Sequence, residues 1–170
     1  PFVSESLREA MGDQAKKLAS AIGYTSAGTV EFIVDKNKDF YFLEMNTRLQ
    51  VEHPVTELVT GIDLVEEMIR IAAGEEIKIK QEEVNINGWA IESRIYAEDP
   101  ERNFMPSTGI LNDYLVPEDI DNIRNDTGVY EGSEISIYYD PMISKLCAFA
   151  KDRSDALSTM ESALNKHFIR

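Results

Sequence analysis

A run of nine residues, Glu44-Met45-Asn46-Thr47-Arg48-Leu49-Gln50-Val51-Glu52, constrains the fold of this chain more than any other feature. Every second residue of the run is polar or charged. In an extended strand, residues two apart point to the same face. If the whole run stays extended, five functional groups line one face at steps of about 6.5–7 Å. A merely solvated strand face would more often carry Thr, Ser and Lys in no special order, so we expect a binding face.

The residues before this run predict its partner strand. Two segments of strand-forming residues, 29–34 and 40–46, flank a short polar loop and indicate a β-hairpin. With a four-residue loop at 36–39, Glu31 stands directly opposite Glu44, with Cβ atoms about 4.5–5.5 Å apart. Two carboxylates so placed repel each other unless a cation lies between them. A slip of one residue would send them to opposite faces, so this prediction depends on the loop length.

The same face offers the groups that an ATP-dependent reaction on a small acid needs. Glu31, Glu44 and Asn46 supply oxygen ligands, which suit Mg²⁺ (or Mn²⁺) together with phosphate oxygens. Arg48 carries a planar guanidinium that can grip a small oxyanion through two hydrogen bonds. Glu52 is a candidate general base. A cation site, an anion clamp and a base within nine residues suggest ATP-dependent activation of a small acid.

Helical spacing predicts the other elements of the first half. A helix begins at Ser6, with Ser4 as a competing start, and ends at Gly23. A short helix starts at Pro54 and runs to about residue 60. Another is capped by Asp63.

The second half is mostly strands, closed by a helix that starts near Ser154. We expect Trp89 and Cys147 in its core. The fold class is therefore α+β, with a subdomain boundary in the polar segment 77–87. The predicted strands are 88–97, 109–115, 123–125, 135–138 and 143–150.

Composition excludes two classes of function. The net charge of −14 would repel a phosphate backbone, so we expect no nucleic-acid partner. No apolar run approaches the roughly 18 residues of a membrane span, so we expect no membrane partner. A single cysteine excludes an internal disulfide and suits a reducing compartment.

Several motifs resemble the signature of biotin carboxylases. The resemblance lies in 29–32 (Thr-Val-Glu-Phe) and in 44–57, which ends Arg-Leu-Gln-Val-Glu-His-Pro-Val-Thr-Glu. It continues through 61–65, 92–100 (Glu-Ser-Arg-Ile-Tyr-Ala-Glu-Asp-Pro) and 138–146, and so covers almost the whole chain. ATP-grasp enzymes in general share the two glutamates and the asparagine, whereas the Arg-to-Glu run is specific to biotin carboxylases.

This resemblance implies a domain arrangement. Residues 1–80 would be the C-terminal part of an ATP-grasp domain, and residues 81–170 an incomplete biotin carboxylase C-terminal domain made of a small sheet and a helix. In detail, 87–90 and 132–140 are most similar to the α subunits of propionyl-CoA carboxylases. The resemblance also implies a fragment of a longer ligase.

The resemblance also implies a reaction. ATP and bicarbonate give carboxyphosphate, which delivers CO₂ to N1′ of protein-bound biotin. By position, the two glutamates and the asparagine would hold the metal ions that bridge ATP. Arg48, Gln50 and the Val51 backbone N–H would bind bicarbonate, and Glu52 would deprotonate it. Arg94 would stabilise the biotin enolate.

The implied partners are ATP, bicarbonate, a biotin carrier domain that this chain lacks, and a carboxyltransferase subunit. We expect an oligomer in full length, in the mitochondrial matrix by resemblance or otherwise in the cytoplasm. The chain shows no Gly-rich phosphate lid and no Met-Lys-Met-type biotin attachment site, so we expect it to be inactive alone. Two alternatives stay open: another ATP-grasp ligase, such as a carbamoyl-phosphate or amino-acid ligase, and a non-catalytic subunit-contact module.

Overall fold

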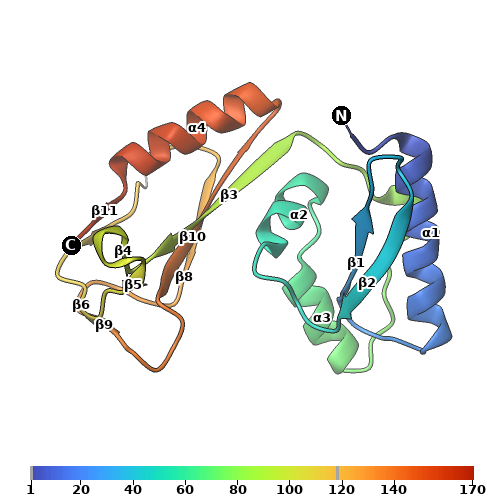
Figure 1. Ribbon diagram of the computed structural model, residues 1–170, viewed down its shortest axis with the longest axis horizontal. Coiled ribbons are helices and arrows are strands. Elements are labelled where there is room, and N and C mark those ends of the chain that lie inside the picture. The colour runs from blue at the N-terminus through green and yellow to red at the C-terminus, as the bar shows by residue number, and fades with distance from the viewer. Residues whose placement is uncertain (1, 118) are drawn as a thin grey trace. The chain divides into compact units, whose positions relative to one another are not determined.

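The computed structural model describes residues 2–117 and 119–170 (Figure 1). The chain divides into two compact units. Unit 1 contains the residues up to His53 and the segment Asp63–Gln81, and unit 2 contains Pro54–Ile62 and Glu82–Arg170. The chain therefore enters unit 2 twice, first for a short segment and then for the whole of its second half.

The first element of unit 1 is the helix α1 (Glu5–Ala21). Its N-cap is Ser4, whose Oγ accepts a hydrogen bond from the backbone N–H of Leu7 at 3.3 Å. The predicted start at Ser6 is therefore wrong and the competing start is right, because Ser4 has the extended backbone that an N-cap requires. The helix stops before Gly23, whose φ of +61° lies in the left-handed region that glycine adopts without strain.

A β-hairpin follows α1 and lies beside it (Figure 1). Its strands are β1 (Thr29–Val34) and β2 (Phe40–Asn46), which pair antiparallel within the predicted bounds. The rings of Phe32 and Phe40 meet edge to face with centroids 5.4 Å apart, and Phe40 also faces α1. One face of the hairpin is therefore aromatic, and its Phe40 end faces the helix. Residues adjacent to Phe32 point to the other face.

Two short helices follow the hairpin. The first, α2 (His53–Thr60), belongs to unit 2 from its second residue onward, whereas α3 (Leu64–Ala72) belongs to unit 1. Asp63 caps α3 by accepting a hydrogen bond from the backbone N–H of Glu66 at 2.8 Å, which confirms the predicted cap. Gly74, with a φ of +87°, follows the C-cap Ala73 in the left-handed region that glycine adopts without strain.

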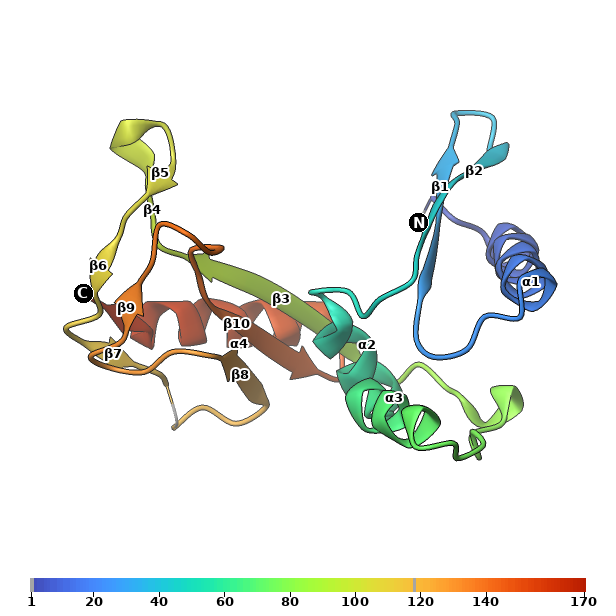
Figure 2. The ribbon, with the colours of Figure 1, turned by 90° about the horizontal axis from the view of Figure 1, so that it is seen from below.

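A three-stranded antiparallel sheet forms the centre of unit 2. Its strands are β3 (Trp89–Tyr96), β10 (Met142–Ala150) and β8 (Ile123–Thr127), in the order β3-β10-β8. The helix α4 (Arg153–Lys166) runs along this sheet in both ribbon views (Figures 1 and 2). The sheet and its helix confirm the α+β class predicted for the chain.

The core of unit 2 lies between α4 and one face of the sheet. Leu146 and Ala148 from β10 meet Met160 and Ala163 from α4, and all four are buried. Isoleucines of the two outer strands complete this face: Ile91, Ile95 and Ile123. Because side chains alternate along a strand, the opposite face of the sheet carries the residues in between. Those residues include charged side chains such as Glu92, Arg94 and Asp126, together with Cys147 and Phe149 of β10.

The rest of unit 2 is built from very short strands and turns. A second small core of Leu111, Ile135 and Ile143 joins them to β10. The predicted continuous strands 109–115 and 135–138 are wrong, because irregular backbone with a bend at Asn112 divides the first, and the second leaves the strand conformation after Ile135. The short elements are β4 (Glu98–Asp99), β5 (Met105–Pro106), β6 (Gly109–Ile110), β7 (Tyr114–Leu115), β9 (Glu134–Ile135), β11 (Phe168–Ile169), and the 3₁₀ turns η1 (Gln81–Glu83) and η2 (Pro100–Arg102).

Two predictions at the ends of elements need correction or refinement. Trp89 is 50% exposed and not part of the core. It is the first residue of an edge strand, where the sheet extends beyond the layer that α4 covers. Helix α4 begins at Arg153, next to the predicted start, and Asp152 caps it through the backbone N–H of Asp155 at 3.0 Å.

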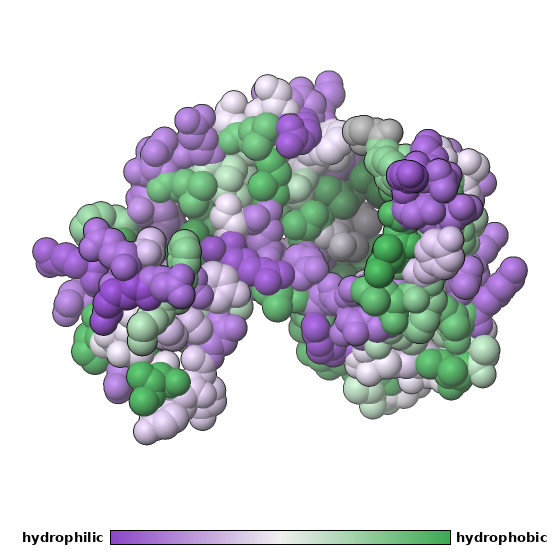
Figure 3. Space-filling view, viewed as in Figure 1, coloured by the Kyte–Doolittle hydropathy of each residue, from purple (hydrophilic) through white to green (hydrophobic). Residues whose placement is uncertain are grey.

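Hydrophilic and hydrophobic side chains are interspersed over each unit on the face seen in Figure 3. None of the helices in the described part of the chain is long and apolar enough to cross a membrane.

We predict that Leu146→Ala destabilises unit 2 far more than Leu157→Ala. Leu146 is fully buried against α4, so truncation leaves a cavity and should lower the free energy of unfolding by about 2–5 kcal/mol. Leu157 lies on α4 but is 42% exposed, and its truncation should cost less than about 1 kcal/mol. Urea unfolding followed by the fluorescence of Trp89, the chain's one tryptophan, reports on this unit. Equal losses in both variants would contradict this view of the core.

Candidate active site

The two glutamates predicted to face each other do so. Glu31 on β1 is the cross-strand partner of Glu44 on β2, and Thr29 is the partner of Asn46. Residues on one face of a strand lie two apart, so Glu44 and Asn46 share the face that Glu31 occupies on the neighbouring strand. This face is the one opposite the aromatic side that packs on α1.

The loop length on which the pairing was predicted is wrong. The loop comprises residues 35–39, not 36–39, and next to it Val34 pairs with Phe40. If this register continued unbroken along the strands, Glu31 would pair with Leu43 and not with Glu44. The register shifts between Glu31 and Phe32, with Leu43 as the extra residue on β2. This β-bulge restores the alignment of the two carboxylates.

Asp35 holds the loop in its shape. Its Oδ1 accepts hydrogen bonds from the backbone N–H groups of Asn37 at 2.8 Å and Asp39 at 2.9 Å. Lys38 adopts a φ of +71°, a left-handed conformation that occurs mainly in turns. The longer loop is therefore a defined turn, and the bulge compensates for it.

Amide groups bridge the two carboxylates. The Asn46 Nδ2 donates to Glu31 Oε1 at 2.7 Å and to Glu44 Oε1 at 3.2 Å. The Gln50 Nε2 also donates to Glu31 Oε1, at 3.1 Å. The N–H groups of the Asn46 and Gln50 amides thus lie beside the carboxylates, where a cation would otherwise offset the two negative charges. The structure therefore brings together four of the predicted site residues.

This donor set fits a divalent metal that shares its coordination with phosphates. Across residues 2–117 and 119–170, no cluster of three or more His, Cys, Asp or Glu side chains is placed to hold a metal by itself. The hairpin offers two carboxylates and one amide, and rotation of the Asn46 amide would present its Oδ1 in place of Nδ2. Mg²⁺ is commonly held by one or two carboxylates together with substrate phosphates. The hairpin fits such a site.

The segment after Asn46 does not continue as a strand. β2 ends at Asn46, so the expectation that five alternating groups share one strand face is wrong beyond this residue. Arg48 is exposed, and its Nη1 donates to the Leu49 carbonyl oxygen at 3.2 Å. Val51 is half-buried and Glu52 is exposed, and both lie in the turn that precedes α2.

A histidine closes this turn. The His53 backbone N–H donates to the Gln50 carbonyl oxygen at 3.2 Å, and its Nδ1 lies 2.8 Å from the same oxygen. Two contacts to one carbonyl fix the ring at the first position of α2. Gln50 and Val51, which the resemblance implies for bicarbonate, therefore lie in a closed turn that leads directly into a helix, whereas Arg48 precedes this turn.

Arg94 lies on the charged face of the unit 2 sheet. Its Nε is 3.6 Å from Glu92 Oε1, two residues along β3. Only 6% of the Glu92 side chain is exposed, and the Cys147 Sγ on β10 lies 3.7 Å from its Oε2. Burial, together with this carboxylate, raises the pKa of the Cys147 thiol to about 12. The expectation that Cys147 belongs to the core is confirmed.

The same face carries an ionic cluster that sequence reasoning missed. The Arg124 Nη1 donates to Glu57 Oε2 of α2 at 2.7 Å, while its Nε and Nη2 donate to Asp126 at 2.7 and 2.8 Å. Asp126 foremost, and Glu57 with it, raise the pKa of Arg124 above its ordinary value. Glu57 ends the specific run of the signature and Arg124 alternates with Asp126, but neither pattern indicated that they meet.

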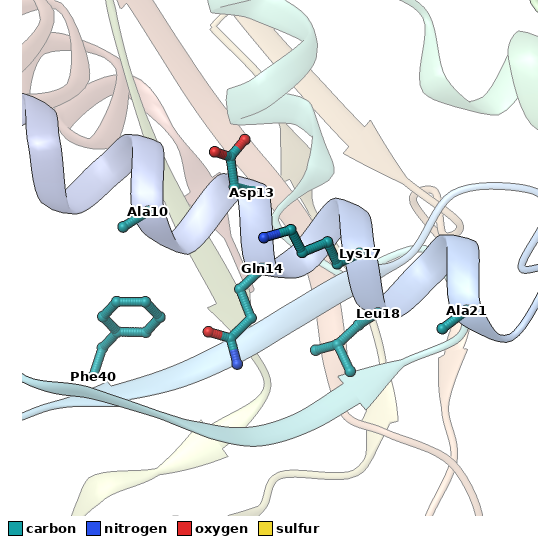
Figure 4. Close-up of a pocket in the computed structure, with 7 residues that line it drawn as sticks. All are labelled: Ala10, Asp13, Gln14, Lys17, Leu18, Ala21 and Phe40. Carbon is teal, nitrogen blue, oxygen red and sulfur yellow. The ribbon is translucent and has the colours of Figure 1, made fainter.

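One cavity of the molecule is separate from these groups. It measures about 530 Å³ and lies between α1 and β2, lined by Asp13, Gln14 and Lys17 with apolar neighbours (Figure 4). Phe40 borders it from β2. Since Phe40 lies on the aromatic face of the hairpin, the cavity is on the side opposite the paired glutamates. It is not the candidate metal site.

Comparison with known families covers both parts of the chain. Residues 1–80 match the carbamoyl-phosphate synthase L chain ATP-binding domain, and residues 92–170 match the biotin carboxylase C-terminal domain. The chain belongs to the biotin carboxylase family. The matched ranges include every predicted site residue.

Individual members of the biotin carboxylase family are similar along the whole chain. The propionyl-CoA carboxylase α chain of Ruegeria pomeroyi is 58% identical over 184 residues, which cover 97% of this chain and 27% of that protein. The mitochondrial propionyl-CoA carboxylase α chain of Homo sapiens is 57% identical over 170 residues, covering 99% of this chain and 23% of that protein. The resemblance to these α chains is confirmed. The chain spans about a quarter of their length.

Solved structures of the family show the same fold. The biotin carboxylase domain dimer of the Hydrogenobacter thermophilus 2-oxoglutarate carboxylase, in complex with MgADP, ADP and bicarbonate, has a TM-score of 0.93 and 47% identity. The matched region covers 99% of the present chain and 37% of the Hydrogenobacter thermophilus chain. The biotin carboxylase subunit of a pyruvate carboxylase has a TM-score of 0.93 and 48% identity. The match covers 99% of the present chain and 37% of that subunit.

We predict that Glu31→Gln or Glu44→Gln in the full-length enzyme weakens the use of Mg-ATP without weakening the fold. Either substitution removes a like-charge repulsion of about 0.2–1 kcal/mol across the hairpin, so the metal-free protein should be as stable or slightly more stable. The KM for Mg-ATP should rise at least about tenfold, because losing even a supporting residue of a metal site costs about 10–100-fold.

Thermal unfolding in EDTA and steady-state kinetics measure the two effects. Glu76→Gln, an exposed glutamate of unit 1, is the matched control and should change neither. Strong destabilisation of the metal-free protein by both hairpin variants would instead make the glutamates structural.

Proposed function

We propose that the full-length protein is the biotin carboxylase component of a biotin-dependent carboxylase. It uses ATP and bicarbonate to form carboxyphosphate, which carboxylates biotin on a carrier domain. The observation that carries this proposal is the Glu31–Glu44 pair bridged by Asn46, in a chain that matches both family segments. Residues 1–80 form part of its ATP-grasp domain and residues 81–170 part of its C-terminal domain.

The hairpin is the metal site of this proposal. Glu31, Glu44 and Asn46 hold Mg²⁺ or Mn²⁺, which neutralises the charge of the ATP phosphates when bound. The support is the fit of the donor set described above, together with the MgADP bound by the Hydrogenobacter thermophilus relative. The two carboxylates orient the phosphates by fixing this charge on one face of the hairpin.

The turn after β2 is the bicarbonate site. Arg48, Gln50 and the Val51 N–H bind bicarbonate, and Glu52 accepts its proton so that the bicarbonate oxygen attacks the γ-phosphorus and ADP leaves. The Gln50 side chain supports this assignment, because it lies 3.1 Å from Glu31 and so links the turn to the metal hairpin. A base that acts on bicarbonate must lie within hydrogen-bond reach of the proton that it removes, and Glu52 follows Gln50 and Val51 in this turn.

Arg94 acts at the biotin step. Carboxyphosphate splits into CO₂ and phosphate, the phosphate takes the N1′ proton of biotin, and N1′ then attacks the CO₂ carbon. The guanidinium stabilises the negative charge that develops on the ureido oxygen. Glu92 lies beside Arg94 and is almost fully buried, so it limits the directions in which the guanidinium can point.

The acyl-CoA partner follows from the relatives. We propose a carboxyltransferase subunit specific for propionyl-CoA, an oligomeric holoenzyme, and a location in the mitochondrial matrix or, in a bacterial source, the cytoplasm. Support comes from the propionyl-CoA carboxylase α chains, of which the human one is mitochondrial.

Kinetics of two variants in the full-length enzyme test the bicarbonate site. Arg48→Ala should raise the KM for bicarbonate as well as lower kcat, because the clamp acts before the proton moves. Glu52→Gln keeps the shape and a hydrogen-bonding oxygen but loses basicity, so kcat should fall by about 10²–10⁴ with a smaller change in KM. The measurement is bicarbonate-dependent ATP cleavage, stimulated by free biotin.

Two results would count against the proposal. A near-normal kcat in Glu52→Gln would remove that residue from the mechanism. ATP cleavage that does not depend on bicarbonate would favour another ATP-grasp ligase, and no ATP cleavage at all would favour a subunit-contact module.

The isolated 170-residue chain should not carboxylate biotin. We expect its affinity for ATP to be weaker than about 1 mM, or about −4.1 kcal/mol, because it spans about a quarter of the related enzymes. Isothermal titration with Mg-ATP and a carboxylation assay measure both. Turnover by the isolated chain would show that these residues are sufficient for the reaction.

A further inference from the structure

An ion pair between distant segments joins α2 to the sheet of unit 2. Glu57 on α2 is only 8% exposed, and its Oε2 accepts a hydrogen bond from Arg124 Nη1 at 2.7 Å, across 67 residues of sequence. Glu57 lies in the segment that matches the ATP-binding domain, whereas Arg124 lies in the segment that matches the C-terminal domain. The pair therefore fixes a piece of one family segment inside the compact unit formed by the other.

The Arg124 guanidinium is held rigidly before it reaches Glu57. Its Nε and Nη2 donate to the two oxygens of Asp126, at 2.7 and 2.8 Å, in a bidentate arrangement within β8. A planar guanidinium fixed along one edge can present its remaining nitrogen in only one direction. Nη1 therefore meets α2 at a defined place on the sheet.

The ionic contacts continue toward the strand that carries Arg94. The Lys145 Nζ on β10 lies 3.7 Å from Asp126 Oδ2. Lys145 is the cross-strand partner of Asp126 on one side and of Arg94 on the other. One row of the sheet thus links the anchor of α2 with the residue proposed for biotin.

Helix α2 begins directly after the proposed base. Glu52 is followed by His53, which closes the turn on the Gln50 carbonyl oxygen and is the first residue of α2. From there to Glu57 the chain is a continuous helix, so fixing Glu57 on the sheet also fixes the point from which the turn departs. A displacement of about 1 Å in a reacting group can cost about 10²-fold in rate.

Stability alone is a poor reason for such a pair. The Glu57 side chain is 7% exposed and that of Arg124 34%, and the cost of taking these charges partly out of water offsets much of their attraction. A pair that gives little net stability but a single geometry fits a role in orientation.

We propose that Arg124 and Glu57 are positioning residues for bicarbonate activation, acting through α2 on the turn that holds Glu52. This inference rests on the proposed function. Neither residue touches the substrate. Their effect is to hold α2, the helix into which the turn leads.

The test compares variants of the full-length enzyme in bicarbonate-dependent ATP cleavage. Glu57→Gln removes the charge but keeps the shape, and Arg124→Lys keeps the charge but cannot bind Asp126 and Glu57 together. Each should lower kcat by about 10–10²-fold and raise the KM for bicarbonate, with the KM for ATP within about twofold of the wild type. The double variant should lose no more than either single variant, since both break one unit.

The bicarbonate KM separates positioning from stability. A variant that merely folds less well contains fewer active molecules, which lowers the apparent kcat and leaves both KM values unchanged. The control is Asp119→Asn, which breaks the exposed ion pair between Asp119 and Lys166 in the same unit and should leave all three constants unchanged.

Each result decides the proposal. An unchanged bicarbonate KM in Glu57→Gln and Arg124→Lys overturns positioning while leaving the proposed function intact. If these variants do not fold, Glu57→Asp keeps the charge and shortens the reach, and an unchanged bicarbonate KM there overturns positioning as well. Wild-type enzyme whose ATP cleavage ignores bicarbonate overturns both the proposed function and this inference.

Discussion

Two carboxylates held face to face are the constraint on which the first half of the structure depends. Glu31 and Glu44 repel each other at the distance of a cross-strand pair, so the hairpin keeps them aligned only because its register is fixed. A defined turn, a bulge and two amide donors all contribute to that alignment. None of these features is needed for a stable hairpin as such. They are needed for a hairpin that keeps two like charges ready for a cation.

The sheet of unit 2 treats charge in the opposite way. One face is apolar and covered by α4, and on the other face acidic side chains pair with basic ones, within a strand, between β8 and β10, and between β8 and α2. The hairpin places two negative side chains together, whereas the sheet pairs acidic side chains with basic ones. A site that binds a metal and a site that must keep an arginine oriented would be expected to differ in this way.

The sequence predicted the elements of regular structure better than their ends and connections. The periodicity of the hairpin, α3 and the central sheet was strong enough to place them. The pairing of Glu31 with Glu44 was right although the loop is one residue longer than predicted, because a β-bulge restores the alignment. The bulge itself was missed because the local sequence pattern does not show it. The residues after Asn46 keep their polar–apolar alternation in sequence, but they are not part of the strand. The turn that they form is closed by a contact between the His53 ring and the Gln50 carbonyl oxygen, which alternation does not predict.

The sequence indicated candidate residues that lie close together along the chain and missed contacts between distant ones. The nine-residue run pointed to candidate metal and bicarbonate residues because their chemistry lies side by side along the chain. Glu57 and Arg124 meet at 2.7 Å, yet 67 residues separate them. Trp89 was wrongly assigned to the core, because the sequence of a strand does not show whether another element covers its end.

The burial of Cys147 has a practical consequence for work on this chain. A thiol reacts as the thiolate, and a fully buried thiol with a pKa of about 12 is almost entirely protonated at neutral pH. The one native cysteine of the chain should therefore resist maleimides and mild oxidants while unit 2 stays folded. A cysteine introduced at the surface could be labelled selectively without first removing the native one, and modification of Cys147 itself would report that the sheet has opened.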